Sequence, residues 1–191
     1  LFDFKEQISD IPEFVNDITD KYGSLKGMVL SAGIQYTLPI SAEKFEKSKE
    51  LFDINYFSNI ELIKQFGKKK NNQGAGSSAV AISSFTSKLG IPGINAYSAS
   101  KAALNSSIKT IAIEFANKNI RLNSILAGHV KTALLTGNLP ESILNNLEKK
   151  YPLGFGEPDD VANLACFLLS DSAKWITGSE YIIDGGASIN F

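Results

Sequence analysis

Tyr97 and Lys101 stand four residues apart in the segment INAYSASKAAL, whose other members are mainly small. On a helix, this spacing places both side chains on one face, with Cβ atoms about 5–6 Å apart. A nearby ammonium group favours the phenolate and lowers the pKa of a tyrosine from its usual value near 10. Such a phenol can protonate a carbonyl oxygen or deprotonate an alcohol near neutral pH. The pair therefore predicts acid–base chemistry, although the same spacing also occurs on ordinary helix surfaces.

Ser84 is a second candidate because it ends a predicted strand over residues 78–84 and precedes Tyr97 by a loop rich in glycine and proline. A helix that begins near residue 96 would bring the two hydroxyl groups to the same edge of the sheet. A serine hydroxyl there could hydrogen-bond the same substrate oxygen and stabilise the charge that develops on it. The alternative interpretation is a strand-end serine that caps a loop.

Strand and helix patterns alternate along the chain. The helical pattern over 96–118 has a core stripe of Leu104, Ile108, Ile111 and Phe115. Helical segments of this length between apolar strands imply βαβ crossovers and a parallel sheet with helices on both faces. The predicted strands are 27–33, 78–84, 120–128 and 180–186. The predicted helices are 10–23, 41–67, 96–118, about 140–149 and 158–170. Asp10 is the predicted N-cap of the first helix and Ser41 that of the second.

Length and composition indicate one soluble globular domain. The 191 residues can form a substantial core, and no linker or repeat divides them. Hydrophobic residues make up 43% of the chain and charged residues 20%. The formal net charge of −1 gives no reason to expect a nucleic-acid partner, and the run Lys68–Lys70 is predicted to be a solvated loop.

Other site types find little support in the sequence. No run approaches the roughly 18 apolar residues of a membrane helix and no signal peptide is visible, so we expect no membrane association and a cytoplasmic location. Cys166 lies in an apolar helical pattern and is predicted to be a buried hydrophobe without a disulfide. One histidine and one cysteine provide no cluster of metal ligands. His129 is interpreted as an exposed loop residue, with the alternative that it reaches a substrate pocket.

Several motifs, in the right order, resemble the short-chain dehydrogenase/reductase family over nearly the whole chain. "ISSFTSKLGIPGINAYSASKAAL" resembles the family's serine–loop–Tyr-x-x-x-Lys segment, and "DINYFSN" resembles its helix asparagine segment. "SAGI" is similar to its Asn-Ala-Gly motif, "IRLNSILAGHVKT" to its Asn-x-x-x-Pro-Gly-x-x-x-Thr loop, and "FGEPDDVANLACFLLSDSAKWITGSEYIIDGG" to its C-terminal signature. The resemblance implies an α/β fold with a Rossmann-like, doubly wound parallel sheet in three layers (α/β/α), formed by a single domain over residues 1–191.

The resemblance also implies roles for the matching positions. Tyr97 would be the general acid/base, Lys101 would lower its pKa and hold the nicotinamide ribose, and Ser84 would orient the substrate carbonyl. Asn55, by itself a polar residue in a helical pattern, would anchor a water that links Lys101 to solvent. The cofactor would be NADP or NAD. Asp3 would contact its adenine, and Ala32 and Gly33 would lie on the adenosine side, while Gly128, Val130 and Thr132 would contact the nicotinamide. Further cofactor contacts would come from Ser31, Asn55, Tyr97 and Lys101.

The sequence departs from the family pattern at three places. Ser31 stands where the family usually has asparagine, and Ala127 where it usually has proline. The third departure is the lack of a glycine-rich turn that would place the cofactor pyrophosphate at a helix N-terminus. Leu1–Phe4 resembles the family's third strand, so we expect the chain to be a fragment, truncated at its N-terminal side by at least one βαβ unit. The strand at 27–31 would then be an exposed edge, and the residues that select NAD or NADP would lie elsewhere.

These features predict an oxidoreductase that uses NAD or NADP to interconvert a small-molecule ketone and a secondary alcohol. By resemblance the substrate is a 3-oxoacyl thioester or a sugar or polysaccharide precursor, with steroid-like alcohols as further candidates and specificity carried by residues 133–150. The alternative is a truncated, catalytically silent module that cannot bind a dinucleotide and acts only as an oligomer partner. Family analogy implies a homodimer or homotetramer packed through residues 42–67, residues 96–118 and the terminal strand.

Overall fold

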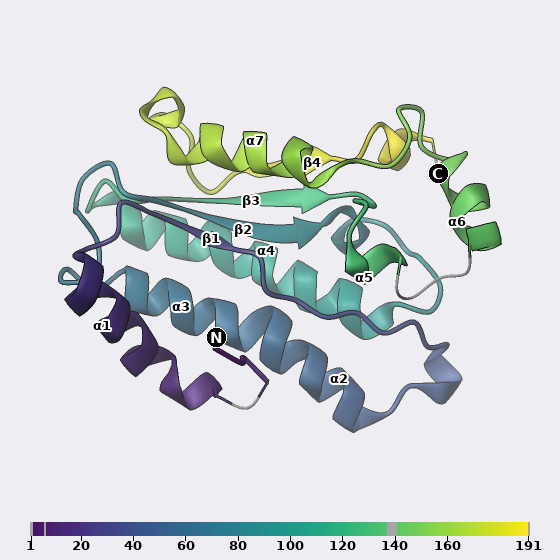
Figure 1. The fold of residues 1–191 in the computed structure, drawn as a ribbon, viewed down its shortest axis with the longest axis horizontal. Coiled ribbons are helices and arrows are strands. Elements are labelled where there is room, and N and C mark those ends of the chain that lie inside the picture. The colour runs from purple at the N-terminus through teal and green to yellow at the C-terminus, as the bar shows by residue number, and fades with distance from the viewer. Residues whose placement is uncertain (1, 6, 137–140, 191) are drawn as a thin grey trace.

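The computed structural model describes residues 2–5, 7–136 and 141–190. Its strands are β1 (Gly27–Leu30), β2 (Ser78–Ser84), β3 (Arg121–Ala127) and β4 (Glu180–Ile183). They form a sheet in the order β1-β2-β3-β4 in which all neighbouring pairs are parallel (Figure 1). Ser84 and Ala127 are register partners, so β2 and β3 end side by side. The predicted parallel α/β sheet is confirmed.

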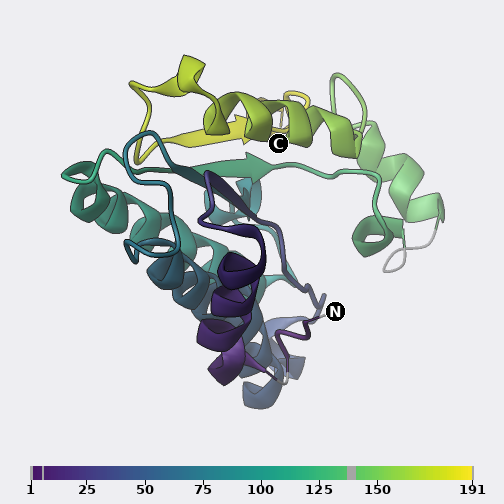
Figure 2. The same cartoon turned by 60° about the vertical axis from the view of Figure 1, so that its left-hand side comes forward.

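Helices cover both faces of this sheet (Figures 1 and 2). They are α1 (Ile11–Tyr22), α2 (Phe45–Phe52), α3 (Ser58–Phe66), α4 (Asn95–Ala116), α5 (Ala133–Thr136), α6 (Glu141–Glu148) and α7 (Pro158–Leu169). The core beneath α1, α3 and α4 includes Phe66, Leu104 and Ile108, whereas the core beneath α7 includes Ile125 and Leu168. The two cores on opposite faces of the sheet give the three layers that were predicted.

The first helix begins and ends where the sequence predicts. Asp10 is its N-cap residue, and Pro12 lies in its first turn, where a missing N–H costs no helical hydrogen bond. Gly23 ends the helix with a φ of +83°, in the left-handed region that favours glycine. Ile11 and Val15 on the inner face of α1 are buried in the core.

The predicted helix over 41–67 is interrupted twice. A 3₁₀ turn at Ile40–Ala42 is followed by extended backbone, so Lys44 rather than Ser41 is the N-cap residue of α2. The prediction of Ser41 as the cap is therefore wrong. A π-helical turn at Asp53–Phe57 then joins α2 to α3. Such turns are rare and occur frequently at functional sites.

Two further predictions from the sequence are corrected. Leu1 lies outside the described residues, while Phe2 to Phe4 form no strand; Phe2 instead stacks on Phe14 of α1, with ring centroids 4.4 Å apart. Cys166 is exposed rather than buried, because α7 turns other side chains toward the sheet.

β1 forms one edge of the sheet. It pairs with β2, and no strand among the described residues pairs with its other side. Val29 in the middle of β1 is 44% exposed. The predicted exposed edge is therefore present in this structure.

The basic run after α3 lies at the surface. Lys68–Lys70 are exposed at the end of α3, as predicted for a solvated loop. Within the described ranges, no helix combines the length and the apolar character needed to span a membrane.

Candidate active site

A cavity of about 720 Å³ opens at the carboxyl ends of the strands. Ligands bind at this edge of open parallel sheets, and small-molecule sites commonly measure about 300–1,000 Å³. Residues from the ends of β1, β2 and β3 and from the first turns of α4 meet there. The predicted site residues that line it are Ser31, Gly33, Ser84, Tyr97, Lys101, Gly128, Val130 and Thr132.

Tyr97 lies in the first turns of α4 and is buried, with 9% of its surface exposed. Burial raises the pKa of its phenol, and a hydrogen bond with the Ser84 side chain lowers this pKa in part. The predicted meeting of the two hydroxyl groups is thus present. The effect of Lys101 on this pKa remains a prediction, and in this structure the lysine donates to a backbone carbonyl oxygen.

That partner of Lys101 is the backbone of β2. The lysine is 4% exposed, and its Nζ donates a hydrogen bond to the carbonyl oxygen of Ile82 at 2.9 Å. Burial lowers the pKa of Lys101 to about 8. No carboxylate of the described residues lies within ion-pair distance of its ammonium group. The Lys101 ammonium group is therefore buried at the cavity without an opposite charge beside it.

Ser84 is held by its own turn at the end of β2. Its Oγ lies 3.0 Å from Thr86 Oγ1 and accepts a hydrogen bond from the Thr86 backbone N–H at 3.3 Å. Ser87 donates to the Ser84 carbonyl oxygen at 2.6 Å and in turn accepts from Asn105 of α4 at 2.8 Å. These contacts fix the end of β2 against the helix that carries Tyr97.

Asn55 lies in the π-helical turn, is fully buried and does not line the cavity. Its Oδ1 accepts from the Ile34 backbone N–H at 2.8 Å, and its Nδ2 donates to the Ile34 carbonyl oxygen at 2.9 Å. Nδ2 also lies 3.2 Å from Ser100 Oγ on α4. The asparagine therefore connects the segment after β1 to the helix of Tyr97 and Lys101. The predicted water-anchoring role remains a prediction.

The loop after β3 is shaped by close backbone contacts. A Cβ on Gly128 would lie 2.8 Å from Cα and Cβ of Asp184, so a larger residue does not fit without a shift. Val130 forms a parallel bridge with Gly156. The Thr132 hydroxyl donates to the Val130 carbonyl oxygen at 3.3 Å.

His129 is not the exposed loop residue that was predicted. It is half-buried and lines the cavity, as the alternative interpretation proposed. Its Nδ1 forms a short hydrogen bond with the hydroxyl group of Tyr151, and burial lowers the pKa of the imidazole. Sequence reasoning missed Tyr151 because it lies 22 residues from His129 and belongs to no motif that was recognised.

Asp3 and Ala32 do not line the cavity. Asp3 is exposed, and its Oδ1 accepts a hydrogen bond from the Lys5 backbone N–H at 2.8 Å. The role of Asp3 at an adenine ring therefore remains a prediction from family resemblance. Among the described residues, no group of three or more histidine, cysteine, aspartate or glutamate side chains could hold a metal ion.

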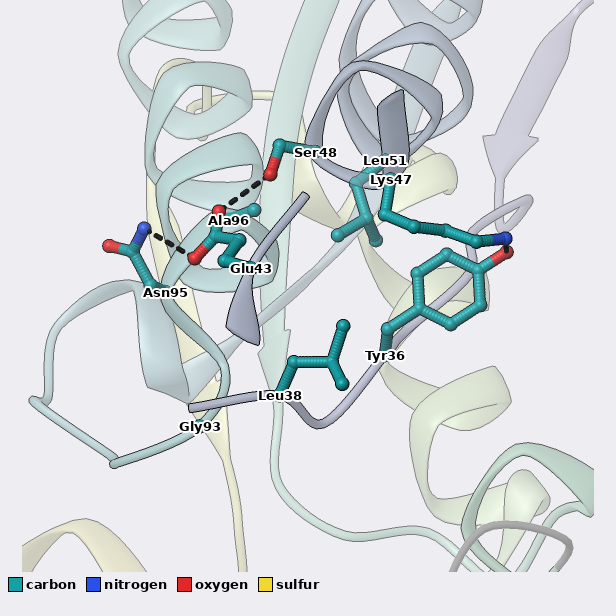
Figure 3. Close-up of a pocket in the computed structure, with 9 residues that line it drawn as sticks. All are labelled: Tyr36, Leu38, Glu43, Lys47, Ser48, Leu51, Gly93, Asn95 and Ala96. Carbon is teal, nitrogen blue, oxygen red and sulfur yellow. Dashed lines mark hydrogen bonds between the residues drawn. The ribbon is translucent and has the colours of Figure 1, made fainter. Parts of the chain in front are cut away.

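A much smaller pocket lies between α2 and the start of α4 (Figure 3). There Glu43 accepts hydrogen bonds from Ser48 Oγ at 2.6 Å and from Asn95 Nδ2 at 3.0 Å. No predicted site residue lines it. Its contacts join the segment before α2 to the first residue of α4.

A charged cluster borders this small pocket. Glu50 accepts from Lys47 at 3.0 Å, from Lys5 at 2.9 Å and from the Tyr36 hydroxyl group at 3.0 Å. Both lysines have exposed side chains, and their hydrogen bonds lower the pKa of Glu50 to about 2. We call these four residues the Glu50 cluster.

Comparison with known proteins identifies the family. A family model described as enoyl-(acyl carrier protein) reductase matches residues 6–188. With that match and relatives above 30% identity, the chain belongs to the short-chain dehydrogenase/reductase family, which is a family of oxidoreductases. The resemblance inferred from the motifs is confirmed.

Individual relatives are similar over most of the chain. It is 34% identical over 183 residues to the 3-oxoacyl-[acyl-carrier-protein] reductase of Thermotoga maritima, covering 94% of this chain and 72% of that protein. It is 30% identical over 175 residues to the NADP-dependent (R)-specific alcohol dehydrogenase of Lentilactobacillus kefiri, covering 89% of this chain and 69% of that protein. A solved short chain dehydrogenase family protein from Francisella tularensis has a TM-score of 0.87 and 31% identity, covering 98% of this chain and 79% of that one.

Proposed function

We propose that this chain interconverts a ketone and a secondary alcohol with NAD or NADP as the redox partner. The observation that carries the proposal is the meeting of Ser84, Tyr97 and Lys101 in one cavity. A hydrogen-bonded pair of hydroxyl groups beside a buried ammonium is suited to exchange a proton with a carbonyl oxygen. The names of the two relatives, a 3-oxoacyl reductase and an alcohol dehydrogenase, support this reaction class.

The residues around Gly33 fit the nicotinamide and ribose end of such a cofactor. A Cβ at this position would lie 3.2 Å from Asn55 Oδ1 and 3.3 Å from Lys101 Nζ, so glycine keeps the approach to the lysine clear. The Lys101 ammonium donates one hydrogen bond to the protein and has further N–H groups for ribose hydroxyls. Gly128, Val130 and Thr132 would hold the other side of the ring. When bound, a nicotinamide supplies or accepts the hydride.

The protein residues would move and stabilise the proton. In the direction of reduction, Tyr97 would donate its phenolic proton to the carbonyl oxygen while Ser84 hydrogen-bonds the same oxygen. Burial raises the pKa of Tyr97, so the phenol is protonated and ready to donate at neutral pH. The nearby ammonium of Lys101 would favour the phenolate that remains after transfer.

The cavity walls favour an apolar substrate. Beyond the polar residues named above, the lining is mainly aliphatic, so we propose a ketone with hydrophobic substituents in preference to a free sugar. Part of this lining comes from the segment over 133–150 that was predicted to carry specificity; its positions 137–140 lie outside the described residues. The aliphatic lining residues include Ile91, Ile94, Leu134, Leu135, Leu147 and Val161.

Replacement of Ser84 tests the proposal. We expect Ser84→Ala to lower kcat/KM for ketone reduction about 100-fold, because one donor to the developing oxyanion is lost. The assay follows NADH and NADPH oxidation with a panel of apolar ketones. Ser78→Ala, at the opposite end of β2, is the matched control and should retain activity. Equal activity of the two variants would contradict the proposed role of the cavity.

A further inference from the structure

His129 lies in a box of aromatic rings at the wall of the cavity. Its ring centroid is 6.1 Å from that of Phe85, 5.4 Å from Tyr151 and 5.6 Å from Phe155. The three aromatic side chains are themselves buried in one core cluster. The imidazole is therefore packed against the protein core on several sides while part of it remains open to the cavity.

The backbone on both sides of this imidazole is fixed. The Gly156 N–H donates to the His129 carbonyl oxygen at 3.0 Å, and the Gly128 N–H donates to the Ile183 carbonyl oxygen at 2.8 Å. The main chain of this loop is therefore held by the segments of Gly156 and Ile183. This backbone support keeps the His129 ring among the three aromatic rings. Such support from surrounding contacts is what a precise recognition group requires.

The Tyr151 phenol can select which imidazole nitrogen carries the hydrogen, because it forms a hydrogen bond with Nδ1. Burial, together with the nearby carboxylate of Asp184, raises the pKa of Tyr151, so its phenol stays protonated. Burial lowers the pKa of His129, so its imidazole is neutral at pH 7. A protonated phenol beside a neutral imidazole can donate its hydrogen to Nδ1. A neutral imidazole that accepts at Nδ1 carries its own hydrogen at Nε2.

The imidazole lines the same cavity as the reacting hydroxyl groups. Ser84 and Ala127 are register partners on adjacent strands, and His129 follows Ala127 by two residues. Adjacent strands lie about 4.8 Å apart, so the imidazole is within reach of a substrate group a few bonds from a carbonyl held at Ser84. Among the described residues, Nε2 has no hydrogen-bond partner of its own.

We propose that His129 is a specificity-determining residue that donates a hydrogen bond from Nε2 to a second acceptor on the substrate. The acceptor is a carbonyl oxygen of an ester, thioester or carboxylate close to the reacting ketone. Tyr151 is the positioning residue that fixes the donor tautomer. The proposal rests on the proposed ketone reduction for its substrate, but the state of the imidazole can be measured without turnover.

The first test uses the fact that His129 is the only histidine. Long-range ¹H–¹⁵N spectra of the full chain therefore report this imidazole alone. We expect the Nε2–H tautomer at neutral pH, with an Nδ1 resonance shifted by an accepted hydrogen bond. Tyr151→Phe keeps the ring and removes the hydroxyl group, so the Nδ1 resonance should move to that of a nitrogen without this bond. A wild-type Nδ1–H tautomer, or an Nδ1 resonance unchanged in the variant, overturns the proposal.

The second test compares two ketones of similar length, ethyl acetoacetate and a methyl alkyl ketone without the ester. We expect His129→Phe to raise KM for the keto ester about tenfold and to change KM for the simple ketone less than about twofold. His129→Gln should restore part of the affinity for the keto ester, because its amide can donate. Equal losses for both ketones would mean that His129 serves only packing. If the wild type reduces neither ketone, the proposed function fails while the NMR spectra still decide the donor assignment.

Discussion

Lys101 and Lys47 show how two regions of one molecule tune the same side chain in opposite directions. Lys101 is buried at the cavity, has only a backbone carbonyl as its partner, and its pKa is lowered to about 8. Lys47 lies at the surface in the Glu50 cluster, 3.0 Å from a carboxylate, and its pKa is raised. Burial without an opposite charge dominates in the first region, and pairing dominates in the second.

The difference separates a functional region from a structural one. A buried charge without a counter-charge costs stability, so its presence beside Tyr97 indicates a use other than holding the fold together. The charges of the Glu50 cluster, by contrast, are compensated within the protein, and its lysines are exposed to solvent, where ion pairs contribute little free energy. Its contacts connect α2 to the segments that contain Lys5 and Tyr36.

Two tyrosine replacements give the largest contrast. Tyr97→Phe should lower turnover by about 10³–10⁴-fold, because the titrating hydroxyl is removed while the ring and its packing remain. Tyr36→Phe removes a hydroxyl group from the Glu50 cluster and should leave turnover close to wild type. Steady-state kinetics and thermal unfolding measure both. Near-wild-type turnover of Tyr97→Phe would refute the assignment of the acid/base.

The two lysines can be compared in the same way. Lys101→Met should reduce kcat about 100-fold and weaken NAD(P)H binding, because the ammonium is proposed to act on both the phenol and the ribose. Lys47→Met should change neither. Stopped-flow turnover and fluorescence titration with NADH and NADPH measure the two quantities. If Lys101→Met keeps the wild-type kcat and the wild-type affinity for NAD(P)H, Lys101 has only a structural role.

The pH dependence of stability tests whether Lys101 is buried without a counter-charge. The folded-state pKa of Lys101 is about 8, below its usual 10.5, so the unfolded chain binds more protons between these pH values. The contribution of Lys101 to the free energy of unfolding should therefore rise from pH 8 to pH 10.5, by on the order of 3 kcal/mol. In denaturant unfolding, the difference in unfolding free energy between wild type and Lys101→Met should shift by this amount in favour of the wild type as pH rises through this range. A difference that does not change with pH would show that the lysine is not desolvated.

The Glu50 cluster should give the smallest effect and the opposite pH range. The pKa of Glu50 is lowered from 4.5 to about 2, so its contribution is present above pH 4.5 and is lost as pH falls toward 2. Glu50→Gln should cost less than about 1 kcal/mol near pH 7, because its lysine partners are exposed. The gap between wild type and variant should close on acidification, as measured by urea unfolding. A loss above pH 4.5 that persists unchanged in acid would instead indicate lost packing.

Local sequence patterns predicted much of the fold. The predicted strand over 78–84 matches β2 at both ends, and α1 ends at the glycine that its pattern indicated. These elements succeed because a short run of small and apolar residues, and the conformational freedom of glycine, act over a few residues. The break at Asp53–Phe57 was not predicted, because the side-chain pattern of a π turn differs little from that of a continuous helix.

The exposure of single side chains was less predictable. Cys166 lies in an apolar run and yet is exposed, whereas His129 lies in a polar loop and yet is half-buried. Which side of α7 meets the sheet, and which rings surround a loop, depend on segments far away in the chain. Aromatic partners contributed by residues 85, 151 and 155 could not be assigned to His129 from spacing alone.

Residue types and spacing alone predicted the alternating elements and the placement of Tyr97 and Lys101 one helical turn apart. Both follow from interactions within short segments, in which the residue types and their spacing are sufficient. The hydrogen bond from Lys101 to the backbone of β2 and the contact between Ser84 and Tyr97 depend on how distant segments pack. Burial and hydrogen bonding between distant segments set these contacts and the pKa values that follow from them, because desolvation arises only when the layers pack together.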